Sequence, residues 1–320
     1  MLSRVANSIY WLNRYIERAE NNARFIDVNI NLTMDLPPGL EEQWRPLVMT
    51  SGDGDYFREK YGEFSRKNVV EFLVFDRENA NSIFSCISSA RENARMVRDS
   101  LSSELWFHIN EMFHKLSEMQ LDKNKREENL IPFLKEVKWG SHLYSGIMEA
   151  IFDRSEAWHF AVLGRFLERA DKSARILDMK YFYLLPHIKF VGTPLDLLHW
   201  SAVLKSASGF EMYRKRYGSL NVCDIVRFIV LDRAFPRSIL FCLATAEHSL
   251  HAIMGTTINT FLTTAEKEIG KLRSELEYTD VDDIFEMRVH EYLDNCLIKI
   301  NNIGNEIQKT FFKLHEPVLL

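Results

Sequence analysis

The chain has 320 residues with only 13 Gly and 8 Pro, and this shortage of turn-forming residues excludes folds built from many short strands and tight turns. Hydrophobic residues make up 46% and charged residues 27%, a globular composition that excludes a disordered or collagen-like chain. The formal net charge of −5 offers no basic surface for nucleic acid, and four Cys in so long a chain are typical of reduced, structural thiols.

The chain shows no targeting or membrane signal. Arg4, Arg14 and Arg18 interrupt the first twenty or so residues, so that segment has no apolar run of the length found in signal peptides. Nowhere does the sequence approach the roughly 18 consecutive apolar residues of a membrane-spanning helix. We therefore expect a cytoplasmic protein that binds neither membranes nor nucleic acid.

The first predicted element is a long helix. Apolar residues recur at every third or fourth position from Val5 to Ile30, which places them on one side of a single helix. This helix should end before Pro37, because proline lacks the backbone donor that a helix interior needs. A helix of this length needs neighbouring helices to cover its apolar side, so the spacing predicts a helical bundle.

A second long helix is predicted from Phe160 to Leu184, ending at Pro186, and its sequence repeats the first. The segment RYIERAENNARFID (Arg14–Asp27) aligns with RFLERADKSARILD (Arg165–Asp178). Internal similarity of this kind indicates duplicated structural units.

The similarity continues further along the chain. FLVFDRENANSIFSC (Phe72–Cys86) aligns with FIVLDRAFPRSILFC (Phe228–Cys242), and Ser65 and Asn221 occupy equivalent places as N-cap residues before an apolar helix. We expect an all-α fold, a duplicated bundle of long helices with approximate internal two-fold symmetry. Its parts would be a first repeat with the following helix (1–120), a connecting helix with the second repeat (121–254) and two C-terminal helices (255–320), packed as one compact unit.

Charged residues recur on the polar sides of both long helices. Residues three or four apart on a helix are neighbours, so four ion pairs are expected: Arg14 with Glu17, Glu20 with Arg24, Arg165 with Glu168, and Asp171 with Arg175. Three roles are open: a solvated surface, two faces buried against each other across the two-fold axis, or a site for an anionic ligand or an acidic partner. The candidate binding residues on these faces are Arg14, Glu17, Arg18, Arg24, Arg165, Glu168, Arg169 and Arg175.

Two further groups of charged residues are candidates. Asp76-Arg77 and Asp232-Arg233 each end an apolar run, and the Asp is expected to cap the helix that follows, with Pro236 in the first turn of the second such helix. Arg91 and Arg95 recur at helical spacing and predict either an anion-binding stripe or an exposed face.

Signals for metal binding and catalysis are weak. Glu111 with His114, and Glu156 with His159, match the Glu-x-x-His spacing of di-iron bundles. One such match is expected by accident, and Glu156 also fits an N-capping pattern with Asp153, so we expect no metal and no cofactor. The sequence has no nucleotide-binding or hydrolase motif, and Cys86 and Cys242 stand among apolar residues as expected of structural thiols.

Four segments together resemble one known family. MLSRVANSIYWLNRYIERAENNAR (Met1–Arg24), DRENANS (Asp76–Ser82), SARENARMVRDSLSSELW (Ser89–Trp106) and LGRFLERAD (Leu163–Asp171) resemble the alpha-E domain family, bacterial all-helical proteins named for a recurring Glu-Arg motif. The resemblance covers nearly the whole chain. It departs at Ala80, where the family pattern has proline.

The resemblance implies a function in association with other proteins. Genes of this family tend to lie beside those of a circularly permuted ATP-grasp protein and a transglutaminase-like cysteine peptidase. It therefore implies a non-catalytic partner in a peptide-ligating or peptide-modifying system, which binds its partner or substrate through the Arg and Glu faces. The alternatives are an enzyme or small-ligand binder with a pocket formed by the two Glu-Arg motifs, and a metal-binding bundle.

Overall fold

The computed structural model describes residues 1–35, 43–121, 126–183 and 193–313. Within these residues the regular structure is entirely helical, as predicted. Up to residue 151 the elements are α1 (Ser3–Met34), α2 (Arg45–Ser51), α3 (Gly54–Tyr61), α4 (Arg66–Val70), the π-helical turn η1 (Glu71–Phe75), α5 (Ile83–Met96), the 3-10 turn η2 (Arg98–Ser100), α6 (Ser103–Leu121) and α7 (Arg126–Ile151). After it come α8 (Glu156–Tyr183), α9 (Pro194–Ser206), α10 (Phe210–Tyr217), α11 (Val222–Val230), α12 (Ile239–Met254), α13 (Thr264–Tyr278), α14 (Val281–Glu286), α15 (Val289–Ile307) and the π-helical turn η4 (Gln308–Phe312).

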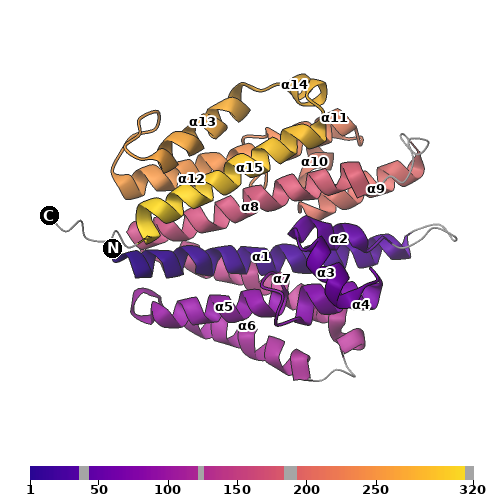
Figure 1. Cartoon of the computed structure of the whole chain (residues 1–320), viewed down its shortest axis with the longest axis horizontal. Helices are drawn as coiled ribbons and strands as arrows, with labels where there is room; N and C mark the ends of the chain where they lie inside the picture. Colours follow the sequence, from indigo (N-terminus) through magenta and orange to yellow (C-terminus); the bar gives the residue numbers. More distant parts are fainter. Residues whose placement is uncertain (36–42, 122–125, 184–192, 314–320) are drawn as a thin grey trace.

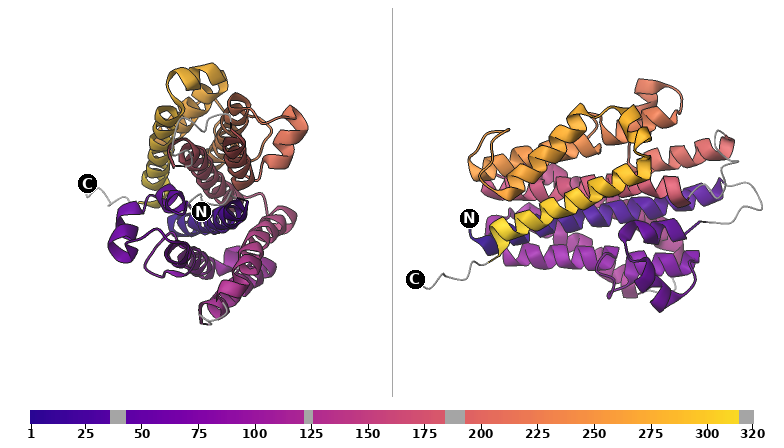
Figure 2. Two further views of the ribbon diagram at one scale, coloured as in Figure 1. Left: turned by 90° about the vertical axis from the view of Figure 1, so that its right-hand side faces the viewer. Right: turned by 45° about the horizontal axis from the view of Figure 1, so that its top comes forward.

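The two long helices α1 and α8 form the centre of the molecule and pack against each other (Figure 1). Helices α5 and α7 cover α1, whereas α12 and α15 cover α8. In the end-on view of Figure 2, α6 and α7 lie on one side of this central pair and α13 on the other. The bundle predicted from the apolar spacing is therefore confirmed, with both predicted long helices at its core.

The predicted apolar stripe explains the position of α1. Ile9, Leu12, Ile16 and Ala23 are all buried. The backbones of α1 and α8 approach very closely at Gly164, where a Cβ atom would lie 2.3 Å from the Tyr10 carbonyl oxygen. Only a residue without a side chain fits such a contact.

Several helix ends follow the predicted chemistry. The side chains of Ser65 and Asn221 accept hydrogen bonds from the backbone amides of Asn68 and Asp224, as N-cap residues do. Pro186 and Pro37, predicted to end the long helices, lie outside the described residues. Among the described helices, none combines the length and the apolar character that a bilayer crossing requires.

Two predictions about helix starts are wrong. Ser82 and Ser238, not Asp76 and Asp232, accept the capping hydrogen bonds of α5 and α12. The physical reason is a loop of several residues after each apolar run, which moves the helix start beyond the Asp and also leaves Pro236 outside α12. The segment 255–313 also differs, because it contains three α-helices, α13 to α15, where two were predicted.

Candidate functional site

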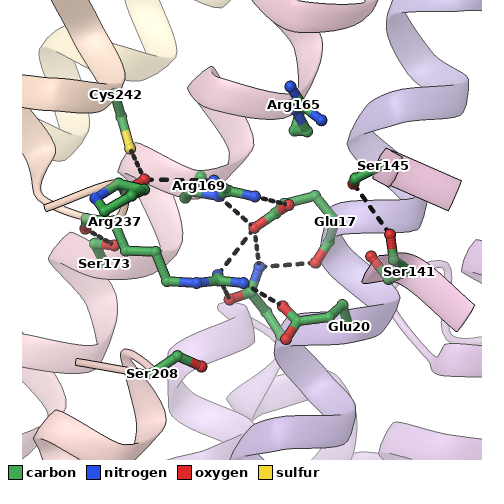
Figure 3. Close-up of polar contacts among 12 residues, drawn as sticks. Glu17, Glu20, Ser141, Ser145, Arg165, Arg169, Ser173, Ser208, Arg237 and Cys242 are labelled. Carbon is green, nitrogen blue, oxygen red and sulfur yellow. Dashed lines mark hydrogen bonds and ion pairs between the residues drawn. The ribbon is translucent and has the colours of Figure 1, made fainter. Parts of the chain in front are cut away.

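Glu17 on α1 is the centre of a buried ion-pair cluster (Figure 3). Its carboxylate is 3% exposed and accepts two hydrogen bonds from Arg169 on α8, from Nε and from Nη2, both at 2.8 Å. Arg237 donates a third from Nη1 at 3.0 Å. Arg237 also contacts Glu20 at 3.0 Å, and Glu20 in turn pairs with Arg24 at 3.0 Å. Glu17 is thus held by two guanidinium groups within the protein interior.

Glu168 on α8 is the centre of a second cluster. Its side chain is 1% exposed and accepts hydrogen bonds from Arg18 Nε at 2.7 Å and from Arg18 Nη2 at 2.9 Å. Arg14 Nε donates to the same carboxylate at 2.8 Å. Both arginines belong to α1, so this cluster also joins the two long helices.

The two clusters are reciprocal. Glu17 on α1 binds Arg169 on α8, and Glu168 on α8 binds Arg18 on α1. Each Glu and the Arg that follows it in the sequence therefore pair with the other long helix rather than with each other. This agrees with helix geometry, because adjacent residues point about 100° apart. Of the three roles left open by the sequence, the described contacts correspond to two faces buried against each other.

The predicted pairs within one helix are correct in part. Glu20 pairs with Arg24 at 3.0 Å, and Asp171 pairs with Arg175 at 2.9 Å. The predicted pairs of Arg14 with Glu17 and of Arg165 with Glu168 are wrong. Arg14 binds Glu168 of the other long helix, and Glu17 binds Arg169 and Arg237. Arg165 is buried and contacts Glu149 of α7 at 3.3 Å. The carboxylate of Glu168 instead accepts hydrogen bonds from Arg14 and Arg18 of α1.

The environment fixes both glutamates as anions. Burial works to raise the pKa of Glu17, but Arg169 and Arg237 outweigh it and hold that pKa well below its ordinary value. Burial opposes the charge of Glu168 in the same way, and Arg18 and Arg14 lower its pKa more strongly. A catalytic acid or base would need a pKa near the working pH, so neither glutamate has the properties of a general acid or base.

These pKa shifts predict acid sensitivity. A carboxylate whose pKa is lowered by folding stabilises the folded state fully above its unfolded pKa, about 4.3 for Glu, and this contribution is lost as the pH falls below it. We expect the free energy of unfolding to fall from about pH 5 downward. Each such carboxylate contributes a slope of up to about 1.4 kcal/mol per pH unit. Urea unfolding of Glu17→Gln should show a flatter pH dependence than the unmodified protein, and equal slopes would contradict the assignment.

Arg237 is a central residue that the sequence did not single out. It lies just before the N-cap of α12 and is buried, with contacts to Glu17, Glu20 and Asn21. In the alignment of the two similar segments, the residue opposite Arg237 is Asn81, which accepts a hydrogen bond from Arg18 at 2.8 Å. Because Arg is charged and Asn is not, the comparison of the two segments did not identify Arg237 as a recurring charged residue.

In both Asp-Arg pairs the side chain of the Asp is largely buried, whereas the Arg is exposed. Asp76 binds Lys60 at 2.9 Å, and Asp232 binds Arg216. The following arginines do not join them: Arg77 lies over the Phe84 ring at 4.6 Å, and Arg233 pairs with Glu277 at 3.1 Å. These residues connect neighbouring helices and are not gathered into one site.

The predicted arginine stripe of α5 divides into two environments. Arg91 lies over the Phe113 ring at 4.7 Å and donates to Asn110 at 2.7 Å, so it joins α5 to α6. Arg95 is exposed and pairs with Glu92 at 2.9 Å.

Metal-ligand candidates are not gathered either. Glu111 pairs with Lys115 at 3.2 Å, and Glu156 pairs with the amino group of Met1 at 2.7 Å rather than capping its own helix with Asp153. His114 and His159 each contact a neighbouring aromatic ring. In the part of the chain that the structure describes, no three His, Cys, Asp or Glu residues are placed to hold a metal ion.

The cysteine residues predicted to be structural are buried. Cys86 and Cys242 are both fully buried, and burial raises the pKa of each thiol to about 12. A thiol with so high a pKa is not a nucleophile at neutral pH.

Comparison with known proteins gives a family. Residues 1–312 match Alpha-E, described as a predicted alpha-helical domain with a conserved ER motif. Similar curated proteins include "Uncharacterized protein Mb2597" of Mycobacterium bovis and "Uncharacterized protein Rv2567" of Mycobacterium tuberculosis, each 20% identical over 272 residues. That alignment covers 79% of this chain and 30% of each relative, so the chain spans less than a third of their length. No solved structure matches significantly. The chain has the Glu-Arg sequence in each of its two central helices, at Glu17-Arg18 and at Glu168-Arg169, and it belongs to the Alpha-E family.

Proposed function

We propose that this protein is a non-catalytic helical partner of a circularly permuted ATP-grasp protein in a peptide-ligating or peptide-modifying system. The observation that carries the proposal is an apolar groove between α6 and α7, with an exposed tryptophan at its rim. Trp139 is 72% exposed, an unusual state for the side chain that most often anchors protein interfaces. The partner would insert an apolar segment beside it.

The groove has the size and composition of a binding surface. Its cavity measures about 390 Å³, and Met112, Phe133 and Val137 form its floor. Leu143, also exposed, continues the apolar rim. Charged residues line the edge of the groove: Glu111, Lys115 and Glu136. Protein interfaces usually have such an apolar centre and polar rim.

The buried Glu-Arg clusters support a structural role for the motif in this proposal. Glu17 and Glu168 are enclosed by arginines of the other long helix, so the motif fixes how α1 and α8 are placed. A fixed central pair holds the outer helices α6 and α7, and with them the groove, in one geometry. The partner-binding role expected of the charged candidate residues stays a prediction. Among these candidates, Arg95 and Arg233, which lie outside the Glu-Arg motif, are exposed and accessible to a partner.

The relatives also support association with further protein parts. In them, the region similar to this chain is 30% of a longer polypeptide. A helical domain of this type thus occurs covalently joined to additional sequence, as expected of a domain that acts beside others.

We infer as well that the chain arose by duplication and that its halves are related by an approximate two-fold axis. Aligned residues make the same contacts in both halves. Asn22 donates from its side chain to the Asn81 carbonyl at 2.6 Å, and Ser173 donates to the Arg237 carbonyl at 2.7 Å. The reciprocal pairs of Glu17 and Glu168 follow the same relation.

Co-purification with the ATP-grasp protein encoded in the same genome tests the proposed partner. We expect Trp139→Ala to weaken the complex by about 2 kcal/mol, roughly 30-fold in Kd, because truncation removes the anchor from the groove. The matched control is Tyr278→Ala, which removes an 87% exposed aromatic side chain at the end of α13 and should leave binding unchanged.

The co-purification experiment separates the existence of the partnership from its location on the protein. Absence of binding by the unmodified protein, with the tag at either end of either partner, would refute the partnership. Binding that Trp139→Ala and Tyr278→Ala leave equally strong would retain the partnership and refute the groove as its site.

A further inference from the structure

A second cavity lies on the opposite side of α1, between α1, α8 and α15. It measures about 390 Å³ and is termed the Arg14 pocket. Pockets of about 300 to 1,000 Å³ are the usual size for small ligands. Its lining includes Trp11, Arg14, Asn301, Asn305, Gln308 and Phe312.

Arg14 is held in a fixed orientation in the pocket wall. Its Nε donates to Glu168 at 2.8 Å and its Nη1 to the Tyr10 hydroxyl at 3.1 Å. The guanidinium carbon lies 5.0 Å from the Trp11 ring centre and 5.6 Å from that of Tyr10. Nη2 donates no hydrogen bond within the described residues. Arg14 thus presents an oriented guanidinium group with free donor capacity, which suits a carboxylate.

The charge around Arg14 is not balanced by the protein. Glu168 is shared between Arg14 and Arg18. Two further carboxylates lie near this cluster: Asp171, which pairs with Arg175 at 2.9 Å and lies 4.0 Å from Lys172, and Asp178, whose charge also interacts with Arg175. Four cationic side chains (Arg14, Arg18, Lys172 and Arg175) therefore accompany three carboxylates, and this local excess of positive charge favours an anion in a protein whose net charge is −5.

The opposite wall of the pocket is rich in amide groups. Asn301, Asn305 and Gln308 lie along one side of α15 and the π-helical turn η4, are exposed, and donate no side-chain hydrogen bond to the described residues. Amide side chains both donate and accept, so they match the N–H and C=O groups of a peptide backbone. π-helical turns often occur at functional sites, and η4 places Gln308 and Phe312 in the lining.

We propose that the Arg14 pocket binds the free carboxyl terminus of a short peptide. The carboxylate meets the guanidinium of Arg14, the last peptide groups pair with Asn301, Asn305 and Gln308, and the aromatic rings of Trp11 and Phe312 contact the side chains. Because the pocket is built from α1, α8 and α15, it is separate from the α6–α7 groove, and this inference does not rest on the proposed partner.

Calorimetric titration of the full chain with three probes tests the carboxylate and the peptide contributions separately. N-acetyl-trialanine with a free carboxyl terminus is expected to bind at least 10-fold more tightly than the same peptide with a C-terminal amide, and at least 10-fold more tightly than acetate. Equal binding of the amide would refute the role of the carboxylate. Equal binding of acetate would refute recognition of the peptide groups, and no binding of the free peptide would refute the site.

A pair of glycine variants tests the location. A Cβ on Gly304 would lie 3.7 Å from Arg14 Nη1, an ordinary contact, so the backbone there accepts a side chain, and the larger side chain of Gly304→Leu should fill the pocket. The control is Gly146→Leu on α7, where a Cβ would meet nothing within 4 Å. We expect at least a 10-fold loss of peptide affinity for Gly304→Leu alone. Equal affinity of the two variants, both folded by circular dichroism, would overturn the assignment.

Discussion

Glu168→Ala is expected to lower the free energy of unfolding by about 3 to 5 kcal/mol, the usual effect of removing one partner from a buried ion pair. The carboxylate is 1% exposed and accepts hydrogen bonds from two arginines of α1, Arg14 and Arg18. Its loss leaves both guanidinium groups without their shared anion, in a region that already has an excess of positive charge. Urea unfolding followed by circular dichroism measures the effect.

The control for this variant is Glu111→Ala. Glu111 is exposed on α6 and pairs with Lys115 one helical turn away at 3.2 Å. Pairs of this type contribute only about 0.2 to 0.5 kcal/mol. If Glu168→Ala destabilised the protein no more than Glu111→Ala, Glu168 would not form the buried ion pairs with Arg14 and Arg18 described above.

Gly164→Ala is expected to destabilise the protein by about 1 to 3 kcal/mol through overpacking. A Cβ atom there would lie 2.3 Å from the Tyr10 carbonyl oxygen, which belongs to the backbone of α1 and cannot rotate away. Accommodation would require α1 and α8 to move apart, which would also lengthen the ion pairs between Glu17 and Arg169 and between Glu168 and Arg18.

The expected sign of the change in the free energy of unfolding is opposite to the usual one. In a helix, Gly to Ala normally stabilises by about 0.5 to 1 kcal/mol, because Gly loses more conformational freedom on folding. Gly146→Ala on α7 has open space around the new Cβ and should show that gain. Stabilisation by both variants would mean that the two long helices are not in close contact at Gly164.

Most of the fold was predictable because helix periodicity is a local property. The apolar spacing from Val5 to Ile30 predicted α1, and the equivalent spacing from Phe160 predicted α8. The number of C-terminal helices was not predictable in the same way. The acidic segment from Glu277 to Asp283 indicated the break before α14, but nothing in the sequence indicated the second break, between α14 and α15, where Arg288 has a positive backbone φ of 70°.

The candidate site was predictable only in its residue types. The sequence identified Glu17 and Glu168 but paired Glu168 with Arg165, because spacing within one helix is visible in a sequence whereas the rotation of one helix against another is not. The contacts of Arg237 could not be predicted from the spacing of residues either. It enters the Glu17 cluster from the loop before α12, and the residue aligned with it in the similar N-terminal segment is the uncharged Asn81, so no charge recurs at this position.

The most direct test of the account is a double-mutant cycle that compares two pairings of Glu168. The first cycle combines Glu168→Gln with Arg18→Met, the pair between α8 and α1, and the second combines Glu168→Gln with Arg165→Met, the pair within α8. If the Glu-Arg motif joins the two long helices, the first cycle should give a coupling energy of about 1 to 3 kcal/mol and the second less than about 0.5 kcal/mol. A larger coupling with Arg165 than with Arg18 would contradict the reciprocal pairing of α1 and α8.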